Sequence, residues 1–137
     1  MKFYPPNSNR QVNVNVMKYL IDWDRVVSKP QKQVKDFLFP YWKSHVVLEE
    51  LLVPRTRWRI DLVNLTRKIV IEVSPSQHQH FTPFFHRDRF RFGAAIQRDI
   101  KKEEWSVKNG FKFVEIFGED IDILSPKWFE ETCNISL

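Results

Sequence analysis

Two short apolar segments, 58–63 and 68–73, constrain the fold of this chain more than any other feature of its sequence. In both segments apolar residues alternate with polar ones, which is the pattern of a β-strand with one buried face. A short connection around Thr66 and Arg67 joins them, and such a short link suits an antiparallel pair. The sequence therefore predicts a β-hairpin.

The apolar residues of the two segments also predict how the strands pair. Placing Leu62 opposite Ile71 sets apolar side chains against apolar ones, and a slip by one residue would lose that match. The same register sets Asp61 directly opposite Glu72. Directly opposed residues have Cβ atoms about 4.5–5.5 Å apart, so two like charges there require a neighbouring cation.

Two kinds of cation could balance Asp61 and Glu72. A divalent metal is one, because carboxylate oxygens are the ligands that Mg²⁺ prefers and it usually takes only one or two of them. A neighbouring guanidinium, from Arg57 or Arg59, is the other. The acidic pair alone does not separate these two readings.

The remaining pattern predicts helices at 28–40, 88–109 and 126–132, and strands at 46–53 and 111–117. Ser28 before Pro30 is typical of a helix start, and Gly110 stands where a helix commonly ends. The order is αβββαβ, an α/β fold with a mixed central sheet flanked by helices. A length of 137 residues suits one domain. We expect an N-terminal part over 1–27, with an arm over 1–10 and a short edge strand over 12–16, followed by a core over 28–117 and a C-terminal extension over 118–137.

The basic residues are concentrated in one part of the chain. The net charge is +5, yet positions 55–102 hold eleven Lys and Arg against four Asp and Glu. Such a basic window attracts a polyanion, and nucleic acid is the obvious candidate. An ordinary solvated surface is the alternative.

The long helix predicted at 88–109 has two different faces in this interpretation. Ile100 and Val107 belong to an expected apolar stripe. Lys102 and Trp105 belong to a second stripe that suits a DNA backbone. We expect phosphate contacts from Arg57, Arg59, His86, Arg91, Arg98 and Lys102.

Composition excludes several other classes of protein. The single cysteine, Cys133, excludes an internal disulfide and a cysteine-rich zinc module. No run of about 18 apolar residues exists for a membrane span. We therefore expect a cytoplasmic protein without a membrane partner.

The segment after the second strand of the hairpin carries a further pattern, in which Gln77 and His78 follow Glu72 at short spacing. With Asp61 on the preceding strand, the order resembles the PD-(D/E)XK nuclease superfamily, especially its phage-type and very-short-patch-repair-like branches. The resemblance covers roughly 28–116. It implies a restriction-endonuclease-like core, with Asp61 and Glu72 as ligands of Mg²⁺, for which Mn²⁺ is a substitute.

This sequence departs from the pattern of that superfamily at one catalytic position. The usual lysine, two residues after the glutamate, would fall on Ser74. Its role would then move to Gln77 or His78, and a histidine has a pKa suited to a general base near neutral pH. The superfamily also implies a further acid. Strand alternation lets only one of Glu49 and Glu50 face the site, and we favour Glu50.

The resemblance implies a Mg²⁺-dependent DNA endonuclease, phage-encoded or of the homing type, acting in the cytoplasm of a host cell if phage-encoded. A catalytically inactive DNA-binding protein on the same fold is one alternative, motivated by Ser74. A DNA junction resolvase, which would require a homodimer, is the other.

Overall fold

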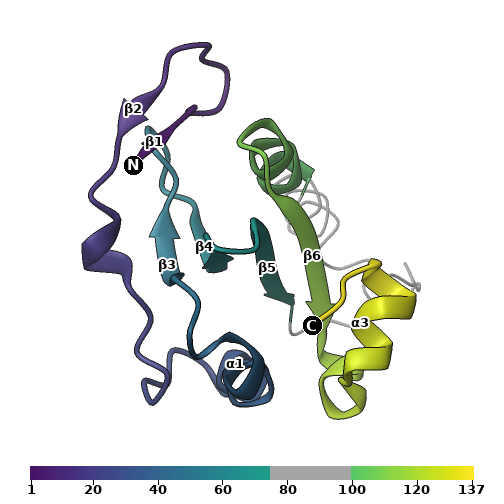
Figure 1. Ribbon diagram of the computed structural model, residues 1–137. Coiled ribbons are helices and arrows are strands. Elements are labelled where there is room, and N and C mark those ends of the chain that lie inside the picture. The colour runs from purple at the N-terminus through teal and green to yellow at the C-terminus, as the bar shows by residue number, and fades with distance from the viewer. Residues whose placement is uncertain (75–99) are drawn as a thin grey trace, which may run out of the picture.

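The computed structural model describes residues 1–74 and 100–137 of the chain. A four-stranded mixed sheet forms its centre, in the order β3 (Val47–Leu52), β4 (Arg59–Asn64), β5 (Ile69–Ser74) and β6 (Lys112–Phe117). β4 is antiparallel to both β3 and β5, whereas β6 is parallel to β5. The predicted α/β class is confirmed, and three of these strands follow one helix as expected (Figure 1).

Helix α1 (Lys29–Trp42) begins where the sequence predicts, because the Ser28 side chain accepts a hydrogen bond from the Gln31 backbone N–H. The helix continues two residues beyond Pro40. A proline in the last turn loses one backbone donor. The fully buried side chains of Leu38 and Trp42 anchor this end of the helix by their packing in the core.

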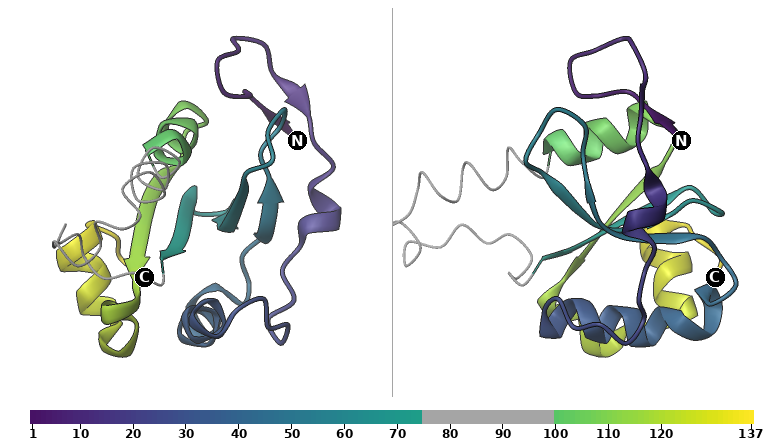
Figure 2. Two further views of the ribbon diagram at one scale, coloured as in Figure 1. Left: turned by 180° about the vertical axis from the view of Figure 1, so that it is seen from behind. Right: turned by 90° about the vertical axis from the view of Figure 1, so that its left-hand side faces the viewer.

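Two apolar cores lie on opposite faces of the sheet. The first, here the α1-side core, contains Val34 and Leu38 of α1, Phe129 of α3 (Pro126–Cys133) and the inward residues of the strands. Figure 2 shows α1 and α3 together on this face of the sheet. The predicted C-terminal extension therefore supplies part of the core.

The second core, here the Trp105-side core, lies under the helical residues 100–108. Trp105 and Phe111 pack there against Phe3, whose ring is 5.7 Å from Trp105 between centroids. Phe3 belongs to β1 (Lys2–Phe3), which pairs with β2 (Val12–Asn13). The expected arm over 1–10 thus includes a β-strand whose Phe3 packs in the core. The expected strand over 12–16 is formed only at Val12–Asn13, and a 3-10 helix, η1 (Val16–Tyr19), begins at its expected end.

The helical residues 100–108 bury the face opposite to the one we predicted. Ile100 and Val107, expected on the apolar stripe, are 49% and 62% exposed, whereas Trp105 is buried. The Trp105 side chain also donates a hydrogen bond from Nε1 to the Tyr4 carbonyl at 2.9 Å. A large aromatic ring with a satisfied polar atom gains more from burial than a valine does, so Trp105 sets the rotation of the helix.

Beyond β6 the chain forms a 3-10 helix, η3 (Gly118–Ile123), before α3. Within the described residues, no helix combines the length and apolar character needed to cross a membrane.

Candidate functional site

The strands β4 and β5 separate at the position of the two predicted acids. Their ladder begins at Asn64 and Ile69 and ends at Leu62 and Ile71, the pair predicted from the sequence. One residue further along, Asp61 Oδ2 accepts a hydrogen bond from the Val73 backbone N–H at 2.7 Å. A side-chain carboxylate thus takes the place of a backbone acceptor, which fixes Asp61 between the two strands.

Glu72 is buried beside Asp61, with only 7% of its surface exposed. Burial, followed by hydrogen bonding and charge repulsion from Asp61, raises the pKa of Glu72 to about 9. At neutral pH a proton therefore remains on Glu72 in the absence of another cation. Two carboxylates that share one proton form a site with an unmet demand for positive charge.

Lys102 supplies part of that charge. Its Nζ atom lies 3.0 Å from Glu72 Oε1, and its side chain is 18% exposed. The ammonium lowers the pKa of Glu72 but does not cancel the effects of burial and Asp61. Apart from this ion pair, Glu72 Oε1 accepts no hydrogen bond from the described residues. Lys102, which we expected on a DNA-facing stripe, lies at the carboxylate pair instead.

Glu50 stands across from Asp61 in the β3–β4 register, which passes from the pair Glu49–Leu62 to Leu51–Ile60. The pKa of Glu50 is raised, first by burial and then by the charge of Asp61. The third predicted carboxylate is therefore close enough to Asp61 for their charges to interact.

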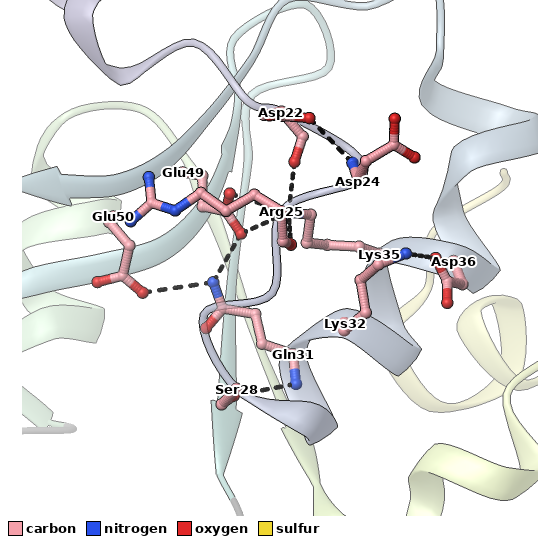
Figure 3. Close-up of polar contacts among 10 residues, drawn as sticks. All are labelled: Asp22, Asp24, Arg25, Ser28, Gln31, Lys32, Lys35, Asp36, Glu49 and Glu50. Carbon is pink, nitrogen blue, oxygen red and sulfur yellow. Dashed lines mark hydrogen bonds and ion pairs between the residues drawn. The ribbon is translucent and has the colours of Figure 1, made fainter.

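The backbone of Glu50 has a positive φ of 55°, which interrupts the alternation of β3. As a result Glu49 and Glu50 both face α1, where Gln31 Nε2 donates to Glu49 Oε2 at 3.0 Å and to Glu50 Oε1 at 3.3 Å (Figure 3). The strict alternation expected for these two glutamates therefore does not hold, although this contact with α1 does not decide which of them faces Asp61. Regular alternation does not hold through a left-handed residue.

The buried lysine of α1 explains the role of Glu49. Lys35 is fully buried and its Nζ lies 2.9 Å from Glu49 Oε1 and 2.9 Å from Oε2. The same ammonium donates to the carbonyls of Asp22 at 2.6 Å and Arg25 at 2.8 Å, as Figure 3 shows. Glu49 is thus held in a structural ion pair, which leaves Glu50 as the glutamate of β3 nearer to Asp61.

Sequence reasoning missed Gln31 and Lys35. Both lie on the buried stripe of α1 with Val34, Leu38 and Trp42, at spacings of three and four residues. Two polar residues on an apolar stripe are a signal that could have pointed to a buried polar network.

The arginines proposed as an alternative source of neutralising charge are exposed. Arg57 lies in the β3–β4 turn, and Arg59 begins β4. Arg59 Nη1 donates to the Glu50 carbonyl at 3.1 Å and lowers the pKa of Glu50. Among the described residues, the ion pair to Glu72 comes from Lys102.

Five predicted site residues lie outside the described residues: Gln77, His78, His86, Arg91 and Arg98. The described parts of the chain, 1–74 and 100–137, hold no group of three or more His, Cys, Asp or Glu side chains arranged to bind a metal. Among the described residues, the candidate site consists of the pair Asp61 and Glu72, with Glu50 and Lys102 beside them.

Comparison with known proteins gives no match: no family model fits the chain, and no curated protein and no solved structure matches it. The residues of the site and their geometry are therefore the basis for a function.

Proposed function

We propose that the chain is a Mg²⁺-dependent endonuclease that hydrolyses phosphodiester bonds in DNA, on a restriction-endonuclease-like core. The observation that carries this proposal is the buried contact between Asp61 and Glu72 where β4 and β5 separate, with Lys102 beside it. The αβββαβ order of the PD-(D/E)XK superfamily gives further support. The chain has a comparable order: α1, three antiparallel strands, the helical residues 100–108 and a parallel β6.

The donor atoms of the pair suit Mg²⁺. This ion usually binds proteins through one or two carboxylates and takes its other ligands from water and substrate phosphate, so a group of three protein ligands is not required. Apart from its contact with Lys102, the buried Glu72 Oε1 accepts no hydrogen bond from the described residues, and burial and Asp61 raise the pKa of Glu72 to about 9. Both features favour a cation at this place.

Each residue of the site has a distinct role in the proposed reaction. Asp61 and Glu72 would hold the metal, with Glu50 assisting, and the metal when bound supplies a Lewis acid for the scissile phosphate. The Val73 N–H fixes the orientation of Asp61. Gln77 or His78 would orient the attacking water or accept its proton.

Lys102 takes on part of the role left by Ser74 in this proposal. Its ammonium balances Glu72 before a cation binds. Because the lysine side chain is flexible and part of it is exposed, its Nζ can move from Glu72 to a phosphate oxygen of the substrate. Lys102 would then stabilise negative charge that develops on that phosphate.

A catalytically inactive DNA-binding protein is the second candidate. It is favoured by the Lys102–Glu72 ion pair itself, since a permanent lysine counterion would satisfy the acidic pair without any metal. The two candidates make different predictions for metal binding, because only the nuclease needs the carboxylates to exchange the ammonium for Mg²⁺.

The test is cleavage of supercoiled plasmid DNA in Mg²⁺ and in EDTA, with Mn²⁺ binding followed in parallel by electron paramagnetic resonance. Asp61→Asn and Glu72→Gln should abolish cleavage and weaken Mn²⁺ binding while DNA binding is retained. Asp36→Asn is the matched control, since Asp36 is exposed and paired with Lys32 on α1. Wild-type protein that binds no Mn²⁺ and cuts no form of DNA supports the inactive candidate. Cleavage that persists in both variants rejects the site assignment.

A further inference from the structure

A pocket of about 400 Å³ lies on the Trp105 side of the sheet, and Asp61 and Glu72 are not among its lining residues. Its walls are the β3–β4 turn, the helical residues 100–108 and the N-terminal loop at Pro6 and Asn7. Figure 2 shows this turn beside the helix and the N-terminal loop. A concavity of this size is in the range that holds a small organic ligand.

The charged side chains of the pocket are mainly cationic. Arg55, Lys101 and Lys108 line it, against the single acid Glu104. Lys108 Nζ is engaged by the N-terminal loop, where it donates to the Ser8 carbonyl at 2.6 Å. Arg55 and Lys101 are exposed, so their charges can reach an anionic ligand at the mouth of the pocket.

The pocket also has an aromatic wall. Trp58 is half-buried and packs against the Trp105-side core, and it lines the pocket as well. Lys101 Nζ lies 6.0 Å from the centre of the Trp58 ring. An aromatic side chain flanked by cations is the combination that binds unpaired nucleotides, because the base stacks on the ring and the cations contact phosphate.

We infer that this pocket binds an unpaired nucleotide of a DNA strand, with its base against Trp58 and its phosphate on Arg55 and Lys101. The inference rests on the proposed function for the choice of DNA. A paired and stacked base cannot enter a concave site, so the nucleotide must be single-stranded or displaced from the duplex.

The position of the pocket relates it to the proposed catalytic pair. Lys101 lines the pocket, and the next residue, Lys102, contacts Glu72. Trp58 lies just before β4, which carries Asp61. Neighbouring residues of one helix thus contribute to both places, and the pocket's aromatic wall directly precedes the strand that carries Asp61. The favoured substrate is therefore DNA with an unpaired nucleotide near the scissile bond: a single strand, a mismatch or a branch.

Fluorescence anisotropy in EDTA tests this inference without metal or cleavage. The probes are a labelled oligothymidylate of about ten nucleotides and a blunt duplex of the same length. Wild-type protein should bind the single strand more tightly. Trp58→Ala should weaken single-strand binding by about tenfold or more, and Trp58→Phe should retain most of it because phenylalanine still stacks.

The charge contribution is tested by Arg55→Ala and Lys101→Ala, which should weaken single-strand binding, with Lys127→Ala as the matched control. Lys127 is highly exposed on α3 and pairs with Glu131. Equal affinity for duplex and single strand, or full single-strand binding by folded Trp58→Ala or by both charge variants, overturns the inference. Loss of the proposed nuclease activity would not, since binding is measured in EDTA.

Discussion

The ammonium of Lys102 lies 3.0 Å from Oε1 of Glu72, so the helical residues 100–108 and strand β5 are joined by a largely buried polar contact. Burial and Asp61 nevertheless raise the pKa of Glu72 to about 9. The three groups together make the stability of the fold depend on the protonation of Glu72.

The first prediction concerns the pH dependence of stability. Between about pH 4.5 and about pH 9 the folded protein holds a proton on Glu72 that the unfolded chain releases, so stability falls as pH rises through this window. Glu72→Gln removes this dependence. We expect the variant to be more stable than wild type near pH 8, on the order of a few kcal/mol, with the difference shrinking towards pH 5.

Urea unfolding of both proteins at several pH values measures this difference. Lys102→Met serves as the companion variant. Loss of the ammonium removes the contact that lowers the pKa of Glu72, so the fall in stability should extend to higher pH, whereas the same change made in Glu72→Gln should leave the pH dependence nearly unaffected. A constant difference between wild type and Glu72→Gln over this pH range would contradict the prediction.

The second prediction concerns the buried pair of α1 and β3. Lys35→Met leaves the buried Glu49 carboxylate without its ammonium, and breaking a buried pair in this way typically costs about 3–5 kcal/mol. The double variant Lys35→Met/Glu49→Gln should recover part of the loss. Lys32→Met breaks only the surface pair with Asp36, so it should change the free energy of unfolding by less than about 1 kcal/mol.

Chemical denaturation of the four proteins measures these losses. Equal destabilisation by Lys35→Met and Lys32→Met would show that the Lys35 network does not hold α1 to the sheet.

The third prediction concerns the attachment of the N-terminal strand. Trp105→Phe keeps an aromatic ring but loses the hydrogen bond to the Tyr4 carbonyl, which we expect to cost about 1–2 kcal/mol. Trp105→Ala should cost about 3–5 kcal/mol through the cavity it leaves. Val107→Ala, on the exposed face of the same helix, is the control.

Thermal unfolding gives the ranking, and limited proteolysis reports on the N-terminal residues. Cleavage near Tyr4 should accelerate in Trp105→Phe before the rest of the chain is attacked. Identical proteolysis of Trp105→Phe and Val107→Ala would argue against this anchoring role.

The fourth prediction concerns Gly110, which has a φ of +82° after the helical residues 100–108. A Cβ atom added there meets nothing within 4 Å, so Gly110→Ala should cost only the backbone strain of about 1–2 kcal/mol.

Asn134, which ends α3 with φ +55°, allows the opposite substitution, from a residue with a side chain to glycine. Asn134→Gly should be close to neutral, as measured by urea unfolding, because asparagine tolerates this conformation. A neutral Gly110→Ala would show that the backbone relaxes at this turn.

The fold was largely predictable where one local rule determined the outcome. The pairing of Leu62 with Ile71 follows from period-two alternation, and the start of α1 follows from the Ser28 cap. The sequence also indicated Asp61 and Glu72 as neighbours, because register fixes which residues face each other across strands.

Other features depend on contacts that no local pattern reveals. The positive φ of Glu50 turns two successive glutamates to the same side of β3. The rotation of the helical residues 100–108 is set by Trp105, whose partner Phe3 lies near the start of the chain. Lys102 was expected to contact DNA because a basic residue in a basic window suits a phosphate, and no local pattern indicated its contact with Glu72 on β5.

The packing of Phe3 under Trp105 and Phe111 has a consequence for how the chain is made. The hydrogen bond from Trp105 to Tyr4 spans 101 residues of sequence. During synthesis Phe3 lacks these two aromatic partners until Trp105 and Phe111 have left the ribosome. Contacts of such long sequence separation slow folding and lengthen the time in which aggregation competes. The N-terminal strand therefore cannot complete its packing before Trp105 and Phe111 have been made.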